Sequence, residues 1–111
     1  MKGYQVTFYT QQNRRHAGKM LADWVVGLAK ELGLGGATLV SGIEGFGHDG
    51  RFHSHHFFEM ADQPMLIVLA LTEGECARLF QRLEAEGLSL FYVKVAAEFG
   101  LLEGSQPAAA S

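Results

Sequence analysis

The strongest constraint in this sequence is the apolar run 65–71, in which no position carries a polar side chain. A half-buried strand alternates apolar and polar residues, whereas a strand covered on both faces is a continuous apolar run. The run is also far shorter than the ~20 residues that a membrane-spanning helix needs. We therefore expect a buried strand at 65–71, with apolar neighbours on both of its faces.

The periodicity of the remaining chain predicts three more strands and two helices. Strands are expected at 4–9, where residues alternate, at 37–43 and at 88–95, and an extended aromatic stretch at 52–60. Apolar residues at helical spacing predict one helix from Leu21 to Leu32, and a second that ends before Gly87. Gly33 is placed to end the first helix in a left-handed cap, and Thr72 with Glu75 has the spacing of a capping box for the second.

The order strand, helix, strand, strand, helix, strand predicts an α+β fold, the ferredoxin-like βαββαβ arrangement. Two helices cover only one face of such a sheet. Because the run 65–71 offers no polar face, we expect the uncovered side to pack against copies of the same chain. Residues 1–103 are predicted to form this domain, and the small, polar residues 104–111 a disordered tail.

Composition excludes several classes of function. The 111 residues carry 9 Lys+Arg against 12 Asp+Glu, a formal charge of −3, and this balance argues against a nucleic-acid-binding protein. The single cysteine, Cys76, excludes an internal disulfide, and with no signal-peptide pattern at the start it favours a cytoplasmic protein. Cys76 falls on the apolar stripe of the second helix, and Trp24 on that of the first, so both are predicted core residues. No ordered set of nucleophile and base is visible, so we do not expect an enzyme.

A glycine-rich segment is the first candidate binding site. Four of the residues 42–50 are glycine, and glycines let backbone N–H groups approach an anionic ligand closely. Arg51, directly after them, suits bidentate binding of a phosphate or carboxylate. The alternative is a tight connection between two strands that simply requires glycine. The candidate ligand-binding residues here are Gly45, Phe46, Gly47, Gly50, Arg51 and His53.

Histidines gather beside this segment and suggest a second kind of site. His53 and His55 share one face of a strand, and His48 or Asp49 is close enough in sequence to provide a third ligand. Such a nitrogen-rich set suits zinc, copper or nickel. The alternative is an exposed polar hairpin in which only His53 matters, as a hydrogen-bonding residue.

A basic cluster is expected at the start of the first helix. Arg14, Arg15, His16 and Lys19 form it, and with the N–H groups at the start of the helix they are candidates to hold an anion. A solvated basic turn is the competing interpretation.

Several of these motifs together resemble one family. Gly18-Lys19, Gly36-Ala37-Thr38 and the pattern from Gly45 to His53 resemble domain of unknown function 190, which is similar to the PII signalling proteins. The resemblance implies a homotrimer that binds a small anionic metabolite, such as an adenine nucleotide, in clefts between neighbouring subunits. It further implies control of a transporter or metabolic enzyme through a short T-loop-like hairpin. Residues 86–90 and 98–102 lack the glycine-rich segment and the Arg-x-Arg pair of ATP-binding PII proteins. A metal-responsive protein that uses His48, His53 and His55 is the alternative function.

Overall fold

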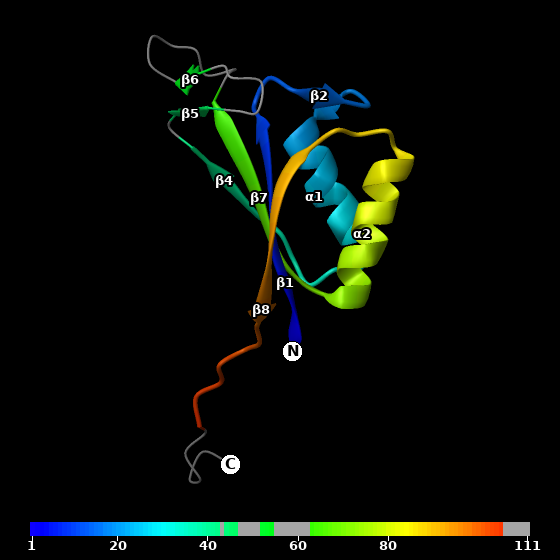
Figure 1. The fold of residues 1–111 in the computed structure, drawn as a ribbon, viewed down its shortest axis with the longest axis vertical. Coiled ribbons are helices and arrows are strands. Elements are labelled where there is room, and N and C mark those ends of the chain that lie inside the picture. The colour runs from blue at the N-terminus through cyan, green and yellow to red at the C-terminus, as the bar shows by residue number, and fades with distance from the viewer. Residues whose placement is uncertain (43, 47–51, 55–62, 106–111) are drawn as a thin grey trace.

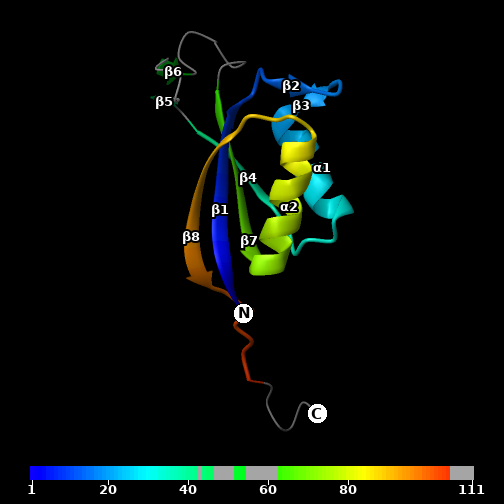
Figure 2. The same ribbon diagram turned by 45° about the vertical axis from the view of Figure 1, so that its right-hand side comes forward.

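The structure is a computed structural model and describes residues 1–42, 44–46, 52–54 and 63–105. A four-stranded sheet carries both helices on one face and leaves the other face open (Figures 1 and 2). The strand order is β4-β7-β1-β8, and every neighbouring pair is antiparallel. The strands are β1 (Lys2–Gln11), β4 (Thr38–Ser41), β7 (Pro64–Thr72) and β8 (Phe91–Glu98). The predicted ferredoxin-like order is therefore confirmed.

The two helices begin and end close to where the sequence predicts. Helix α1 spans Leu21–Glu31 and α2 spans Glu73–Ala85. The capping box at the start of α2 is formed, because Glu75 N–H donates to Thr72 Oγ1 at 3.2 Å and Thr72 N–H donates to Glu75 Oε1 at 2.9 Å. Gly33 and Gly87 follow the two helices with positive φ angles of 73° and 72°, a backbone conformation that favours glycine.

Two short hairpins lie outside the main sheet, and only the first of them was not predicted. The first pairs β2 (Arg15–His16) with β3 (Lys19–Met20) and turns through Ala17 and Gly18, both of which have positive φ. The first strand is also longer than the predicted 4–9, because β1 runs on to Gln11, and β2 follows it at Arg15. The second hairpin pairs β5 (Glu44–Phe46) with β6 (Phe52–Ser54).

The last strand begins three residues later than predicted, at Phe91 instead of Leu88. Leu88 N–H donates to Leu83 O at 3.2 Å, so this residue completes the end of α2. Ser89 O accepts a hydrogen bond from the Arg14 side chain at 2.6 Å, which holds the connection to the hairpin before α1. The end of α2 and the contact with Arg14 therefore use residues that the alternation of the sequence assigned to the strand.

The core lies between the helices and the covered face of the sheet. Val6, Ile67, Leu71 and Leu79 are fully buried there, and Trp24 packs against this core while half-buried. Cys76 is 3% exposed, and burial raises the pKa of its thiol, an effect that the positive charge of Lys94 partly opposes. Because Cys76 belongs to the buried core, the prediction that it is a core residue is confirmed, and a thiol with a raised pKa is a poor nucleophile at neutral pH.

Gly3 is required by the close approach of β1 and β7. A Cβ on Gly3 would lie 2.8 Å from Leu71 C and from Thr72 Cα, and closer still to Leu71 O. These are main-chain atoms of the paired strand, so Gly3→Ala forces the two strands apart. We expect a loss of about 1–3 kcal/mol in the free energy of unfolding, measured by urea denaturation. Gly27→Ala is the control, because nothing lies within 4 Å of its added Cβ in α1, and a gain of about 0.5–1 kcal/mol is expected. Equal stability of the two variants would contradict the strand contact.

Candidate functional site

The glycine-rich segment connects β4 to β7 and carries the β5–β6 hairpin at one end of the sheet (Figure 1). Gly42 N–H donates to Pro64 O at 2.7 Å, which holds the base of the connection against β7. In the hairpin, Gly45 pairs with His53 and Phe46 with Phe52. The candidates Gly47, Gly50 and Arg51 lie outside the described residues, so their proposed roles stay predictions.

The proposed metal ligands are described only in small part. His48 and His55 lie outside the described residues, and only the backbone pairing of His53 in β6 is defined. Within the ranges that the structure describes, no group of three or more His, Cys, Asp or Glu residues is placed to hold a metal ion. The metal hypothesis for His48, His53 and His55 therefore stays a prediction.

The basic cluster lies on the β2–β3 hairpin and not at the start of α1, which is a correction to the sequence analysis. Helix α1 begins at Leu21, after the hairpin. Arg14 Nη2 donates to Ser89 O at 2.6 Å, and Arg15 Nη2 donates to Gly18 O at 2.9 Å. Each guanidinium has five N–H donors, so both residues keep donors for a ligand.

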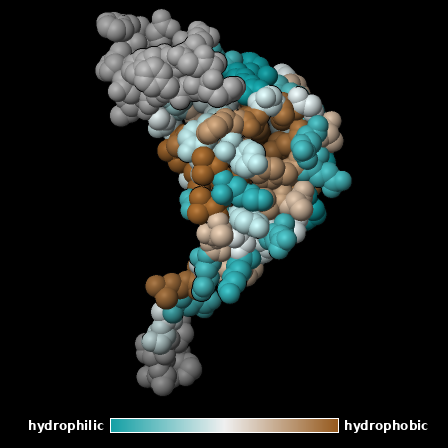
Figure 3. All heavy atoms as spheres, viewed as in Figure 1, coloured by the Kyte–Doolittle hydropathy of each residue, from teal (hydrophilic) through white to brown (hydrophobic). Residues whose placement is uncertain are grey.

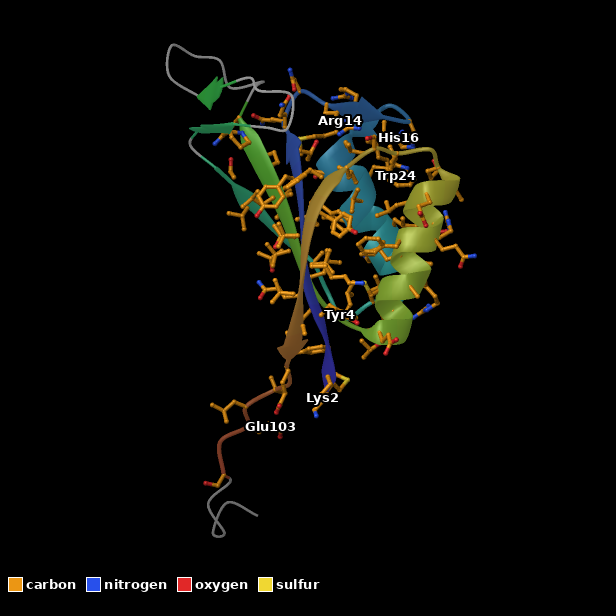
Figure 4. All side chains as sticks on the ribbon, viewed as in Figure 1. Lys2, Tyr4, Arg14, His16, Trp24 and Glu103 are labelled. Atoms are coloured by element: carbon orange, nitrogen blue, oxygen red, sulfur yellow. The ribbon has the colours of Figure 1, made fainter. Side chains whose placement is uncertain are left out.

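His16 connects the β2–β3 hairpin to the end of α2 and to α1 through two contacts. Its Nε2 lies 2.9 Å from Glu86 Oε2, and its ring meets Trp24 edge-on with the ring centroids 4.6 Å apart. Together with the Arg14 bond, these contacts join the β2–β3 hairpin to the connection between α2 and β8 (Figure 4). The arrangement holds Arg14 at the end of the molecule where β1 finishes and the glycine-rich segment begins.

Two polar atoms at this end were missed by sequence reasoning. Thr10 Oγ1 and Gln12 Oε1 are buried and have no hydrogen-bond partner, the only such side-chain atoms in the part of the chain that the structure describes. Thr10 occupies a strand position where β-branched residues are common, so nothing in the sequence marks it. Only the tertiary arrangement shows that its hydroxyl is enclosed.

The open face of the sheet is apolar. Alternation along β1 turns Thr7 and Tyr9 away from the helices, and their β8 partners Val93 and Phe91 share that face. Val95 lies on the same face and is 55% exposed, and the Tyr9 and Phe91 rings meet with centroids 5.5 Å apart. Figure 3 shows hydrophobic side chains gathered on this side of the sheet. We define the open-face patch by its exposed apolar members, Tyr9, Val40, Phe91, Val93 and Val95.

No helix in the described ranges has the length and apolar character needed to cross a bilayer.

The fold is that of the PII-like proteins. A structure of CPII, a nitrogen regulatory PII-like protein from Thiomonas intermedia K12 bound to ADP, AMP and bicarbonate, matches with a TM-score of 0.60 at 18% identity. The match covers 87% of this chain and 89% of that one. A putative PII-like signaling protein from Thermus thermophilus matches with a TM-score of 0.59 at 19% identity, over 86% of this chain and 89% of that one.

The family follows from the sequence. Residues 3–88 match the model of DUF190, a family described as uncharacterized ACR. The chain therefore belongs to the DUF190 family and has the PII-like fold, as the motifs at Gly18, Gly36 and Gly45 predicted.

Proposed function

We propose that this chain is a PII-like regulatory protein and not an enzyme. It assembles as a homotrimer through the open-face patch and binds a small anionic metabolite in the clefts between neighbouring subunits. The ligand is an adenine nucleotide. The observation that carries the proposal is the apolar sheet face that stays exposed on a PII-like fold. Large exposed apolar patches mark interaction surfaces, and identical copies of the chain can cover such a face.

The position of the β5–β6 hairpin supports a regulatory role. It leaves the sheet at the end where Arg14 also lies, so a ligand bound there contacts both the glycine-rich segment and the basic hairpin (Figures 1 and 4). A ligand that binds one arrangement of a hairpin more tightly shifts the population toward it. The hairpin then docks on, or releases, a target such as a transporter or a metabolic enzyme.

The related structures support the ligand class. CPII, which shares the fold, is bound to ADP, AMP and bicarbonate, and all three are anions with oxygen acceptors. Backbone N–H groups at glycines and the two parallel N–H groups of an arginine guanidinium are hydrogen-bond donors suited to such oxygens. In this chain these are Gly45, Gly47 and Gly50, with Arg51 beside them and Arg14, Arg15 and Lys19 on the basic hairpin.

Calorimetric titration with AMP, ADP and bicarbonate tests the proposal. We expect Arg51→Ala to weaken binding of the nucleotide by about 10- to 100-fold, because a charge-assisted bidentate contact contributes about 1.5–3 kcal/mol. The molar mass of the assembly is expected to stay the same. Arg78→Ala is the matched control, since Arg78 lies on the exposed side of α2 and donates to Leu32 O. Unchanged affinity in the Arg51→Ala variant would contradict this pocket.

Thermal-shift measurements with nucleotides and with divalent metals separate the alternative function. If zinc, copper or nickel raises the melting temperature while nucleotides do not, and if replacing His53 and His55 removes that effect, the metal hypothesis holds instead. Stabilisation by nucleotide in that double variant supports the regulatory proposal.

A further inference from the structure

A charged side chain of β8, Lys94, lies on the side of the sheet that the helices cover. Lys94 is in the middle of the strand and pairs with Val6, which is fully buried on that side. Residues directly opposite each other in a sheet share a face, so Lys94 shares the face of Val6. Its Nζ lies 4.3 Å from the centroid of the Tyr4 ring and 5.8 Å from that of the Phe80 ring. These cation–π contacts keep the ammonium group close to the strand.

The two edges of the sheet differ in length. At one edge, β4 has four residues, whereas β8 at the other edge has eight (Figure 2). Tyr92 and Val95 of β8 are 47% and 55% exposed, so this long edge is also apolar. A long apolar edge strand is a template to which another chain can add a strand, and proteins prevent this with short edge strands or with charged side chains such as lysine. The length of β4 limits such pairing at its edge, and β8 lacks that protection.

Pairing of β8 with β8 of a second copy brings the two Lys94 side chains together. In a two-fold antiparallel pair, opposite residues share a face, so helix-side residues lie opposite helix-side residues. The register that joins residues 91–97 places Lys94 directly opposite Lys94 of the second copy. The register that joins residues 92–98 places it opposite Ala96, with the two lysines on a diagonal. The two Cβ atoms are then about 5 Å or about 7–8 Å apart, and like charges at directly opposite positions destabilise the pairing.

We propose that Lys94 prevents the edge of β8 from pairing with β8 of a second copy. The central position of this lysine makes it effective, because both registers with the longest overlap bring the charges close. Tyr4 contributes by holding the ammonium group near the strand. The inference goes beyond the proposed function, since the open-face patch lies on the face of the sheet and the contact that Lys94 prevents uses its edge. Lys94 thus determines which surface of the sheet other copies can use.

Lys94→Met tests the proposal by sedimentation velocity of the full chain over a range of concentrations. Methionine keeps an unbranched side chain against the Tyr4 ring and removes the charge. We expect species of at least twice the wild-type molar mass, with self-association strengthened about 5-fold or more, because the repulsion and the desolvation of two ammonium groups are removed together. Lys30→Met is the matched control, since it removes the same charge from an exposed position of α1. The control is expected to keep the wild-type mass.

Two further variants test whether charge is the cause. Lys94→Arg and Lys94→Glu each place like charges together when two copies of the same variant meet, so both are expected to keep the wild-type mass. An equimolar mixture of the wild-type protein and Lys94→Glu brings opposite charges together across the two edges. We expect this mixture to form the larger species, which neither protein forms alone.

Three results would overturn the proposal. The first is a wild-type mass for Lys94→Met at every concentration, and the second is a larger species for Lys94→Arg. The third is a mixture with Lys94→Glu that does not associate. Lys94→Met is also expected to keep a cooperative thermal transition, so an increase in mass without that transition would count against the proposal as well.

Failure of this inference is distinguishable from failure of the proposed function. A wild-type protein that sediments as a single chain removes the homotrimer, yet Lys94→Met is then still expected to form two-fold dimers. An assembled wild-type protein whose mass does not change in Lys94→Met keeps the homotrimer and removes only the role of Lys94.

Discussion

Val93→Asp is expected to convert the protein from an assembly into a single 12.1 kDa chain. Val93 lies on β8 in the open-face patch, opposite Thr7 of β1, and is 40% exposed in the isolated chain. In an assembly that covers this face, the new carboxylate is buried without a partner, at a cost of several kcal/mol for each copy. Since the residue recurs in every subunit, we expect the dissociation constant to rise about 1,000-fold or more.

Sedimentation equilibrium measures this change directly. Gln81→Glu is the matched control, because it adds one negative charge at an exposed position of α2, on the side of the molecule away from the open face. The control is expected to remain assembled. A wild-type protein that already sediments as a single chain would remove the basis for subunit clefts, while an assembled Val93→Asp variant would show that another surface joins the subunits.

Leu79→Ala is expected to cause the largest loss of stability. Leu79 is fully buried on the inner side of α2, where the helix packs against the sheet. Removing a buried leucine side chain costs about 2–5 kcal/mol, through lost transfer free energy and the cavity that remains. That is a large fraction of the 5–15 kcal/mol that typically stabilises a domain, so about 10 °C or more of melting temperature is expected to be lost.

Thermal unfolding at one fixed protein concentration measures this effect, because assembly makes the melting temperature depend on concentration. Leu101→Ala makes the same chemical change at a residue that is 84% exposed and is expected to shift stability by less than about 0.5 kcal/mol. Similar losses in the two variants would contradict a core centred between α2 and the sheet.

The open-face patch and the core are expected to respond differently to substitution, because helices of the same chain cover the core while, in the proposed assembly, other copies cover the patch. Val6 and Phe8 of β1 are buried by helices of their own chain, whereas Thr7 and Tyr9 turn to the uncovered side. A change at Leu79 is therefore expected to act on a single chain, and a change at Val93 on the proposed contact between chains. This separation lets the two experiments test fold and assembly independently.

Much of the fold was predictable because its signals are local. The run 65–71, the helical spacing from Leu21 and the box formed by Thr72 and Glu75 depend on residues close together in the chain. Periods of two and of 3.6 residues encode strands and helices wherever one face is buried. The family motifs around Gly36 and Gly45 are local too, so membership in DUF190 also followed from the sequence.

The tertiary structure alone decided which polar groups far apart in the chain are paired. Ser89 belongs to the connection and not to β8 because Arg14, 75 positions earlier in the chain, bonds to its carbonyl. In the same way, Thr10 and Gln12 are unremarkable in the sequence, and their unpaired atoms appear only when distant segments enclose them. Hydrogen-bond satisfaction depends on which groups meet in space, and periodicity along one chain does not carry that information.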